Sequence, residues 1–353
     1  MPDSFSALDL EFLPAENRVR LANSGGPEAS FTLPIFDIEG QAVSEYHLAD
    51  RGTPETLSNG ARQVTWTFQS ETFPALSLDL LWRGFAGSPV LRLLFRLRSS
   101  QPLRMTKALV GGVPADRITY LSLSTPGIAA LSLEEIQLSH FDPVVHSYMP
   151  YRRSYRPHEV RDGLAFTGPI AIFHGEGAVL LAAYEHGADH PQGFLGFSLQ
   201  EEDGQRKISL RARKGNYHHN RILRPGQPFE SVWFDLALYP GSLEEFLPVY
   251  RRFFLEEVCI NPQSRQPYVF YNTWNYQERL KYFEHRPYLS EMNAQRMLAE
   301  IDAAHRLGVD VFVIDTGWYG KTGDWLPNLE RFPQGLQEIR QRLDAYGMKL
   351  GLW

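Results

Sequence analysis

Short runs in which apolar and polar residues alternate dominate the first 240 positions of the chain. Residues 63–68 place an apolar side chain at every second position, and residues 90–98 and 207–213 repeat this pattern. An alternation of period two indicates strands with one buried face, and breakers rich in Gly and Pro separate the runs. Sustained helical periodicity is almost absent. The pattern therefore predicts one large antiparallel β-sandwich over residues 1–240.

A helix is predicted directly after this region. Ser242 can cap its N-terminus, and Glu245, three residues later, can complete a capping box. Apolar residues at helical spacing continue to about Val258, and Pro248 falls in the second turn, where it can kink the helix. We expect residues 241–262 to form a linker helix and joint between two domains.

Strand and helix patterns alternate in residues 263–353. Three short apolar runs, 268–272, 309–315 and 348–353, predict strands. Because helical patterns separate them, we expect parallel strands with right-handed crossovers, which are the first strands of a (β/α)8 barrel. The predicted fold class is thus multidomain β plus α/β. A complete barrel needs eight strands, so we expect the sequence to be the front part of a longer protein or a truncated version of one.

Two helices are predicted between these strands. Ser290 is the predicted N-cap of the first helix, which ends at Gly308. The second helix is predicted to start at Pro333 and to stop at Gly347. The residues expected to face inward from these two helices are Ala294, Met297, Leu298, Ile301, Leu336, Ile339 and Leu343.

The middle strand, 309–315, ends in a carboxylate that an indole follows closely. Its β-branched apolar run is typical of a strand buried on both faces of a parallel sheet, and the run breaks at Asp315. In α/β barrels this end of a strand carries the functional residues. A carboxylate accepts hydrogen bonds from sugar hydroxyls, and an indole covers the C–H face of a sugar. The pattern favours a carbohydrate site at Asp315; the alternative is that Asp315 caps the following turn.

Composition narrows the classes of function and location. The chain has 353 residues, of which 43% are hydrophobic, and this length predicts two domains. A net charge of −6 argues against nucleic acid or an anionic membrane as the main partner. No apolar run approaches the roughly 20 residues of a membrane helix, and no signal-peptide pattern is visible. Because Cys259 is the sole cysteine, we expect a reducing, cytoplasmic compartment.

Two adjacent histidines are the one feature that suggests a metal. His218 and His219 follow each other directly, and neighbouring residues of a strand point to opposite faces. They therefore cannot easily bind the same ion. We predict a solvated turn at this position and no metal site.

A series of short motifs occupies the last part of the chain. They are Asn272-Thr273-Trp274, Leu307-Gly308-Val309, Phe312-Val313-Ile314-Asp315, Gly317-Trp318, Gly323-Asp324-Trp325, Arg331-Phe332-Pro333 with Gly335-Leu336, and Gly347-Met348-Lys349-Leu350-Gly351-Leu352-Trp353. In this order and spacing, the segment 268–353 resembles glycoside hydrolase family 36, the α-galactosidases of the melibiase type. The resemblance covers about a quarter of the chain.

The resemblance implies a β-sandwich in front of a TIM barrel that hydrolyses terminal α-galactosides with retention, without metal or organic cofactor. Retaining enzymes need two carboxylates roughly 5 Å apart, and in this family both are aspartates on later barrel strands, beyond Trp353. We therefore assign no catalytic residue and expect the chain itself to be inactive. An α-glycosidase of other specificity, such as an α-N-acetylgalactosaminidase, and a non-catalytic carbohydrate-binding protein stay open as alternatives.

The resemblance also assigns residues to the substrate pocket. In the family the second strand ends in two aspartates that hold galactose hydroxyls; Asp315 matches the first, and Thr316 replaces the second. A hydroxyl is a weaker acceptor than a carboxylate, and Asn275 stands where an acidic residue is common, so strict galactose specificity is less expected. The predicted substrate-binding residues are Asp315, Thr316, Trp318, Trp274, Asp324 and Trp325. For Trp318 and Trp274 the alternative is packing over the barrel mouth, and for Asp324 and Trp325 it is anchoring of a loop.

The segment 147–156 is basic and aromatic. One interpretation is an ordinary surface loop. The other, implied by the resemblance, is a loop that reaches an active site, including that of a neighbouring subunit. We therefore expect a carbohydrate as the partner and, under the second interpretation, a homo-oligomer.

Overall fold

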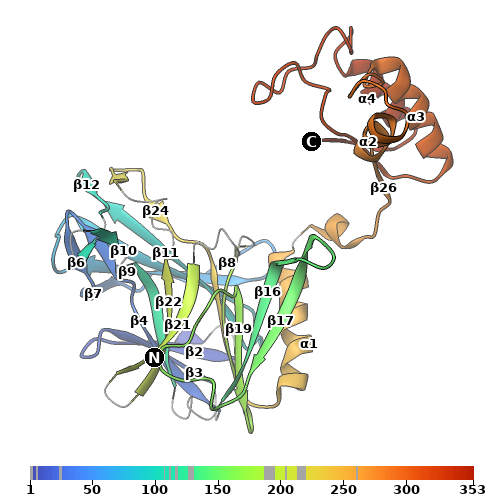
Figure 1. Ribbon diagram of the computed structural model, residues 1–353. Coiled ribbons are helices and arrows are strands. Elements are labelled where there is room, and N and C mark those ends of the chain that lie inside the picture. Colours follow the sequence, from blue (N-terminus) through green and yellow to red (C-terminus); the bar gives the residue numbers. More distant parts are fainter. Residues whose placement is uncertain are drawn as a thin grey trace. The chain divides into compact units, whose positions relative to one another are not determined.

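The computed structural model contains two units, Met1–Val258 and Cys259–Trp353, which we describe separately (Figure 1). The structure describes residues 3–4, 7–23, 26–106, 108–110, 113–115, 118–125, 131–186, 195–202, 205–212, 220–259 and 261–353. His218 and His219 lie outside these residues. The first unit includes the helix that the sequence pattern assigned to a separate linker over 241–262.

Two large antiparallel sheets form most of the first unit, as predicted for a β-sandwich (Figure 1). The eight-stranded sheet has the order β1 (Asp3–Ser4), β2 (Leu8–Leu13), β3 (Arg18–Asn23), β4 (Glu28–Thr32), β15 (Thr119–Ser124), β22 (Gln205–Ala212), β21 (Leu195–Glu202) and β18 (Ala165–Phe166). The main path of the 11-stranded sheet is β17 (Ser147–Tyr155), β16 (Ser132–Asp142), β19 (Ile170–Gly175), β20 (Ala178–Tyr184), β25 (Phe234–Tyr239), β11 (Val90–Ser99), β10 (Leu76–Gly84), β9 (Arg62–Ser70) and β7 (Tyr46–Asp50).

Smaller strand pairs complete the first unit. In the 11-stranded sheet, β24 (Phe229–Glu230) pairs with β11 and β8 (Glu55–Thr56) pairs with β9. The separate two-stranded ribbons are β5 (Phe36–Ile38) with β6 (Gln41–Val43), β12 (Leu103–Arg104) with β23 (Ile222–Leu223), and β13 (Ala108–Val110) with β14 (Val113–Ala115).

The apolar alternation of the sequence becomes the shared core of the two large sheets. On β9, Trp66 and Phe68 are fully buried, whereas Thr65 and Thr67, which alternate with them, are only half-buried. The Trp66 indole meets the Trp82 indole of β10 edge to face, with 5.9 Å between the ring centroids. Residues of both large sheets belong to this one hydrophobic cluster. The two sheets therefore bury each other's inner faces, as in a sandwich.

Helix α1 (Leu243–Phe253) packs on the outer face of the 11-stranded sheet. Its predicted capping box is present: the Glu245 N–H donates to Ser242 Oγ at 3.3 Å, and the Ser242 N–H donates to Glu245 Oε2 at 2.9 Å. Phe246 and Tyr250 are buried in a cluster with residues of β19, β20 and β25. The helix continues as a π-helical turn, Phe254–Val258, and a 3₁₀ turn, Pro262–Arg265, follows. This packing explains why α1 belongs to the first unit.

The second unit contains three parallel strands in the predicted order. They are β26 (Phe270–Asn272), β27 (Val311–Ile314) and β28 (Lys349–Leu352), with α2 (Trp274–Phe283), α3 (Ala294–Arg306) and α4 (Gln337–Ala345) after or between them. In the register, Asn272 and Gly351 both lie opposite Val313. Phe312 and Ile314 of β27 are fully buried in one cluster with residues of α3 and α4.

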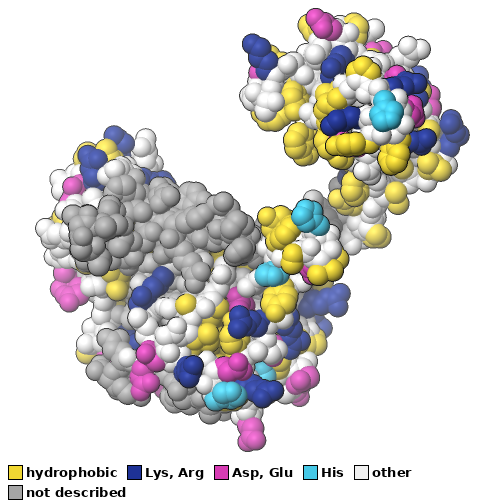
Figure 2. Space-filling view, in the orientation of Figure 1, with side chains coloured by type: hydrophobic (Ala, Val, Ile, Leu, Met, Phe, Trp, Pro, Cys, Tyr) yellow, Lys and Arg dark blue, Asp and Glu magenta, His cyan; other side chains and the backbone are white. Residues whose placement is uncertain are grey.

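The prediction that β27 is buried on both faces is wrong for this chain. Val311 and Val313, which alternate with the buried pair, are only half-buried. Helices α3 and α4 supply the packing on the face of Phe312 and Ile314. Figure 2 shows hydrophobic side chains at the surface of the second unit, and its strands contribute Phe270, 58% exposed, and Leu352, 45% exposed.

The helix boundaries differ from the prediction in three places. The N-cap of α3 is Asn293 rather than Ser290, because the Asn293 side chain accepts a hydrogen bond from the Arg296 N–H. Helix α4 begins at Gln337, after Gly335 in the left-handed region, and not at Pro333. Helix α2 was not predicted at all, since its buried residues, Gln277 and Leu280, are too few to produce a helical stripe. Of the predicted inward residues, Leu298 and Leu336 are half-buried.

Candidate functional site

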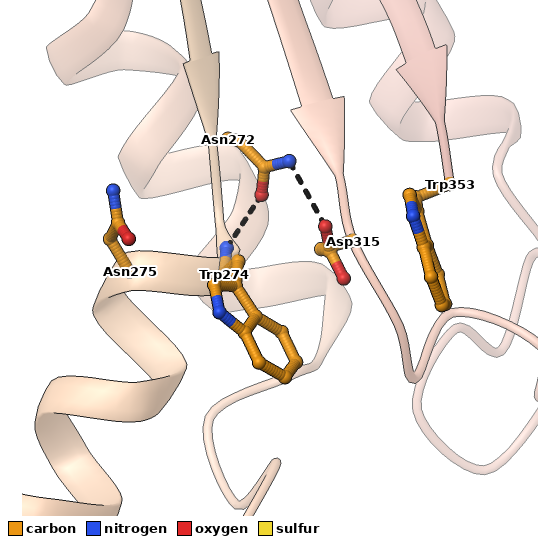
Figure 3. A pocket seen from close by; sticks show the side chains of 5 residues that line it. All are labelled: Asn272, Trp274, Asn275, Asp315 and Trp353. Carbon is orange, nitrogen blue, oxygen red and sulfur yellow. Dashed lines mark hydrogen bonds between the residues drawn. The ribbon is translucent and has the colours of Figure 1, made fainter. Parts of the chain in front are cut away.

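A cavity of about 370 Å³ opens at the carboxyl ends of the three parallel strands (Figure 3). Its lining residues are Asn272, Trp274, Asn275, Asp315 and Trp353. Asn272 ends β26, Asp315 follows β27, and Trp353 follows β28. Strands that run parallel bring their ends to the same edge of a sheet, and in α/β barrels that edge holds the active site. The cavity therefore lies where the strand pattern leads us to expect chemistry.

Asp315 provides the carboxylate of this cavity. It is only 6% exposed, and Asn272 Nδ2 donates to its Oδ2 at 3.0 Å. The Thr316 N–H donates to Oδ1 at 2.7 Å, and the N–H of Asp315 itself donates to Thr273 Oγ1 at 2.9 Å. A carboxylate oxygen can accept two hydrogen bonds, so each oxygen retains capacity for a ligand. The side chain is thus held firmly but is not saturated.

Two indoles stand on either side of this carboxylate in the close-up (Figure 3). Trp274 is 40% exposed and Trp353 is 61% exposed. The Trp274 N–H donates to Asn272 Oδ1 at 2.7 Å, and the Trp274 ring meets the Tyr288 ring edge to face at 6.1 Å. Exposed indole faces beside a carboxylate suit a ligand with both C–H and hydroxyl surfaces.

Trp318 and Trp325 do not line the cavity. Trp318 is 6% exposed, and its Nε1 donates to the backbone oxygen of Trp353 at 2.9 Å. Its ring stacks on that of Trp325 with 6.4 Å between the centroids. Trp318 therefore packs against the loop that follows β27, whereas Trp325 in that loop remains 50% exposed. Trp318 contributes indirectly, because it holds the end of β28 where Trp353 enters the cavity.

Thr316 and Asp324 are engaged elsewhere as well. Thr316 Oγ1 lies 2.8 Å from the hydroxyl of Tyr319. Asp324 Oδ1 accepts hydrogen bonds from the N–H groups of Lys321 and Leu326, so that Asp324 anchors its own loop. Of the six residues predicted to bind substrate, Asp315 and Trp274 are the two that line the cavity. Their role as sugar ligands stays a prediction.

Sequence reasoning did not select Asn272 and Asn275 as binding residues, although both line the cavity. Asn272 lies opposite Val313 in the parallel register, two residues before Asp315. Since neighbouring parallel strands end together, a polar residue at the end of β26 is a signal that could have identified Asn272. Asn275 lies in the first turn of the unpredicted helix α2; its one signal in the sequence was that it stands where an acidic residue is common in the family.

Few charged side chains lie near the cavity. Burial raises the pKa of Tyr288, and the nearby negative charges of Glu278 and Asp315 raise it further. Lys281 Nζ lies 5.1 Å from the Tyr288 ring centroid.

Among the residues that the structure describes, no cluster of His, Cys, Asp and Glu could hold a metal ion. In the same part of the chain, no helix combines the length and the apolar character of a membrane span.

Comparison with known proteins adds independent findings. Residues 252–353 match the family model of melibiase. α-Galactosidase 2 of Pediococcus pentosaceus is 23% identical over 330 residues, which cover 91% of this chain and 43% of that protein. α-Galactosidase Mel36A of Lactobacillus acidophilus is 33% identical over 162 residues, which cover 43% of this chain and 20% of that protein. The chain thus spans less than half the length of these curated relatives.

Solved structures share the fold. The α-galactosidase of Lactobacillus brevis aligns with a TM-score of 0.56 and 18% identity over 93% of this chain and 42% of its own. A variant of α-galactosidase AgaA of Geobacillus stearothermophilus, in complex with stachyose, aligns with a TM-score of 0.59 and 15% identity over 91% of this chain and 45% of its own. These alignments confirm the predicted fold class of a β-sandwich followed by the start of a TIM barrel.

Proposed function

We propose, from the premise that this chain is a protein of the glycoside hydrolase family 36 (melibiase) type, that it forms the sugar-binding part of an α-galactosidase. Its ligand would be the terminal α-galactosyl unit of an oligosaccharide. The observation that carries this proposal is the carboxylate of Asp315, unsaturated and flanked by the indoles of Trp274 and Trp353 at the end of a parallel strand.

The lining of the cavity supports a neutral, hydroxyl-rich ligand. One carboxylate, two side-chain amides and two indoles line it, and no Lys or Arg is among its lining residues. Such a set offers acceptors and donors to sugar hydroxyls and apolar faces to sugar C–H groups. A phosphate or another anion would meet the carboxylate without a cation to compensate for it.

We assign the residues of this chain to binding and none to bond cleavage. Retaining hydrolysis of a glycoside needs two carboxyl groups about 5 Å apart, whereas Asp315 is the sole carboxylate that lines the described cavity. Retention, and the α-galactosidase activity as a whole, are proposed for a protein as long as the relatives, of which this chain spans less than half. Two of the similar solved structures, in complex with stachyose and raffinose, support an oligosaccharide substrate.

A second candidate function is an α-glycosidase for another terminal sugar, such as an α-N-acetylgalactosaminide. The observation that favours it concerns Thr316, which follows the carboxylate directly. Its hydroxyl pairs with that of Tyr319 and does not line the cavity. The cavity thus has one acidic side chain, and recognition of the remaining sugar positions would fall to the amides of Asn272 and Asn275.

Direct titration of the 353-residue chain with monosaccharides tests the proposal. We expect binding of methyl α-D-galactoside, followed by calorimetry or by the fluorescence of the cavity indoles. Asp315→Ala should weaken it at least about tenfold, because a hydrogen bond to a charged group contributes about 1.5–3 kcal/mol. The matched control is Asp324→Ala, which removes a carboxylate that bonds only to its own loop. Equal affinities of the wild type and Asp315→Ala would refute the site.

Methyl α-D-glucoside and N-acetyl-D-galactosamine, titrated in parallel, decide between the two candidate sugars.

A further inference from the structure

We infer that Asn272 is a positioning residue of the sugar site: its side-chain amide orients the Asp315 carboxylate and couples it to the start of helix α2. This inference rests on the proposed function, since it concerns how the sugar-binding carboxylate is held. Asn272 belongs to one of the motifs that carry the family resemblance, but neither Asn272 nor its contact with Asp315 was given a role in the predicted site.

The orientation of the amide follows from its two partners. The Trp274 N–H lies 2.7 Å from Asn272 Oδ1, and a backbone N–H can only donate. The oxygen of the amide must therefore face Trp274. This leaves Nδ2 to donate to Asp315 Oδ2 at 3.0 Å, and the acceptor there can be a fully ionised carboxylate. Both hydrogen bonds are drawn in Figure 3, and neither involves Asn275.

The neighbouring backbone fixes Asn272 in position next to Asp315. Asn272 is the last residue of β26 and lies opposite Val313 of β27. The next residue, Thr273, is fully buried; its N–H donates to the Val313 oxygen at 3.1 Å, and its Oγ1 accepts from the Asp315 N–H at 2.9 Å. The dipeptide Asn272-Thr273 therefore holds both the backbone and the side chain of Asp315. The carboxylate cannot rotate without breaking the bond to Asn272.

Asparagine is the side chain that meets both requirements. The contact to Trp274 needs an acceptor, and the contact to an ionised Asp315 needs a donor. Aspartate at position 272 would supply the acceptor but no donor when it is ionised, and alanine would supply neither. The amide is also neutral. It orients Asp315 without cancelling the negative charge, which remains available to the sugar hydroxyls.

The variant Asn272→Asp turns this reasoning into a pH experiment. A protonated aspartic acid at position 272 can still accept from Trp274 and can donate to Asp315, as the amide does. When both carboxyl groups are ionised, they repel each other at about hydrogen-bond distance. We expect the affinity of Asn272→Asp for methyl α-D-galactoside to approach that of the wild type at pH 5. At pH 8 the affinity of this variant should be at least about tenfold weaker, because a charge-assisted hydrogen bond is lost.

The wild type is the first control for this pH profile. Among the described residues, the titratable groups nearest to Asp315 are the phenol of Tyr288, which interacts with it, and that of Tyr319, which bonds to Thr316; Glu278 and Lys281 lie beside Tyr288. Residues of these types have reference pKa values outside the range from pH 5 to 8. The affinity of the wild type should therefore change little across this range.

Asn275→Asp is the matched second control. It places a carboxyl group in the same cavity, on an exposed residue that makes no hydrogen bond to Asp315 in the part of the chain that the structure describes. Any change in affinity caused by Asn275→Asp should be the same factor at pH 5 and at pH 8. A purely structural role of Asn272 would likewise give Asn272→Asp a pH-independent affinity, which would overturn the positioning role.

A sugar-free measurement separates this inference from the proposed function. If the wild type binds no sugar, the proposed function fails, and thermal stability still tests the contact. The melting temperature of Asn272→Asp should then fall below that of the wild type at pH 8 and recover at pH 5. The double variant Asn272→Asp with Asp315→Asn restores one amide and one carboxylate and should abolish this pH dependence. A melting temperature of Asn272→Asp that parallels the wild type at both pH values would show that the two side chains are not coupled.

Discussion

Two buried carboxylates of the sandwich and Asp315 of the second unit have different hydrogen-bond donors. In the sandwich, Asp79 is 3% exposed and accepts two hydrogen bonds from Arg98, at 2.6 and 2.7 Å. Glu134 is 7% exposed and is paired with Arg152 at 2.8 Å. In the second unit, Asp315 is equally buried, yet its hydrogen-bond donors are the amide of Asn272 and a backbone N–H, both neutral. Its charge is therefore oriented but not cancelled.

A buried carboxylate without a cation is not by itself a binding site, as Glu135 of the sandwich shows. It is 1% exposed and accepts from the hydroxyl of Tyr155 and from the N–H groups of Thr167 and Gly168, and from Gln137 as well. These donors use most of the acceptor capacity of Glu135. Asp315 has two donors and borders a cavity of about 370 Å³. The comparison indicates that a ligand site needs both an uncancelled charge and an unused lone pair beside open space.

The largest expected effect comes from the core that supports the site. Phe312 of β27 is fully buried and belongs to a different hydrophobic cluster from the sandwich core. Phe312→Ala should destabilise the second unit by about 3–5 kcal/mol, the usual range for such a truncation, and should abolish sugar binding. Calorimetry should show an early transition of the second unit, while that of the first unit keeps its temperature.

The counterpart in the sandwich is Trp66→Ala, since Trp66 is also fully buried. It should shift the other transition by a comparable free energy, about 3–5 kcal/mol. If either variant moves both transitions together, the two units do not unfold independently and the comparison between them loses its basis.

An intermediate effect is expected where a cation cancels a buried charge. Arg98→Ala would leave Asp79 buried with the hydroxyl of Thr67 as its remaining side-chain donor. Because Arg98 itself is 47% exposed, water can replace part of the lost contact, and we expect a loss of about 1–2 kcal/mol rather than that of a fully buried pair. Denaturant titration measures this change in the free energy of unfolding.

Arg20 provides the control for that measurement. It pairs with Glu28 at the same distance of 2.6 Å, but both side chains are exposed, at 42% and 52%. Arg20→Ala should change stability by less than about 1 kcal/mol, as is typical of surface ion pairs. A larger loss in Arg20→Ala than in Arg98→Ala would mean that burial does not govern these carboxylates.

Much of this architecture could be predicted because it depends on local patterns. The alternation around Trp66 gives the inner face of β9, and the alternating run at 90–98 coincides with β11. The break of an apolar strand at Asp315 marks the edge of a parallel sheet. These features need no knowledge of distant residues, since a strand's period and the residue that ends it are properties of the segment itself.

The remaining features depend on partners that a local pattern does not reveal. Val313 is half-buried because burial on that face of β27 requires a covering element, not only a β-branched side chain. Trp318 was assigned to the pocket wall, but its ring stacks on Trp325 and its N–H is bonded at the end of β28. Asn272 contacts Asp315 because β26 and β27 pair in a register that places Asn272 opposite Val313. The two paired residues are 41 positions apart in the sequence, so no local pattern shows that they are neighbours.

A small, pH-dependent effect is expected for Glu257, a third kind of carboxyl group. It is 8% exposed, lies in the π-helical turn after α1, lines a cavity and accepts one hydrogen bond from Asn59 at 3.3 Å. Burial, assisted by the negative charge of Glu256, raises its pKa to about 7. Below this pKa a proton suppresses the charge of Glu257, whereas arginine cancels that of Asp79 and Asp315 meets only neutral donors.

The sign of the pH effect follows from this raised pKa. Between the ordinary glutamate pKa of about 4.3 and about 7, the folded state holds a proton that the unfolded state has lost, so the contribution of Glu257 to stability falls as pH rises. Above this window the penalty is constant. Glu257→Gln removes the penalty, and we expect it to raise stability at pH 8 by about 1 kcal/mol relative to the wild type, with solvent screening limiting the gain. At pH 4.5 the difference should nearly vanish.

Melting curves of both proteins from pH 4.5 to 8 measure this difference. The graded control is Glu256→Gln, which removes only the neighbouring charge from an exposed position and should flatten the pH dependence less than Glu257→Gln does. Other buried acids such as Asp235, whose pKa burial also raises, contribute equally to all three proteins and cancel in the comparison. If the curve of Glu257→Gln runs parallel to that of the wild type, Glu257 is ionised in the folded protein at neutral pH, and an uncancelled charge beside a cavity is no longer particular to Asp315.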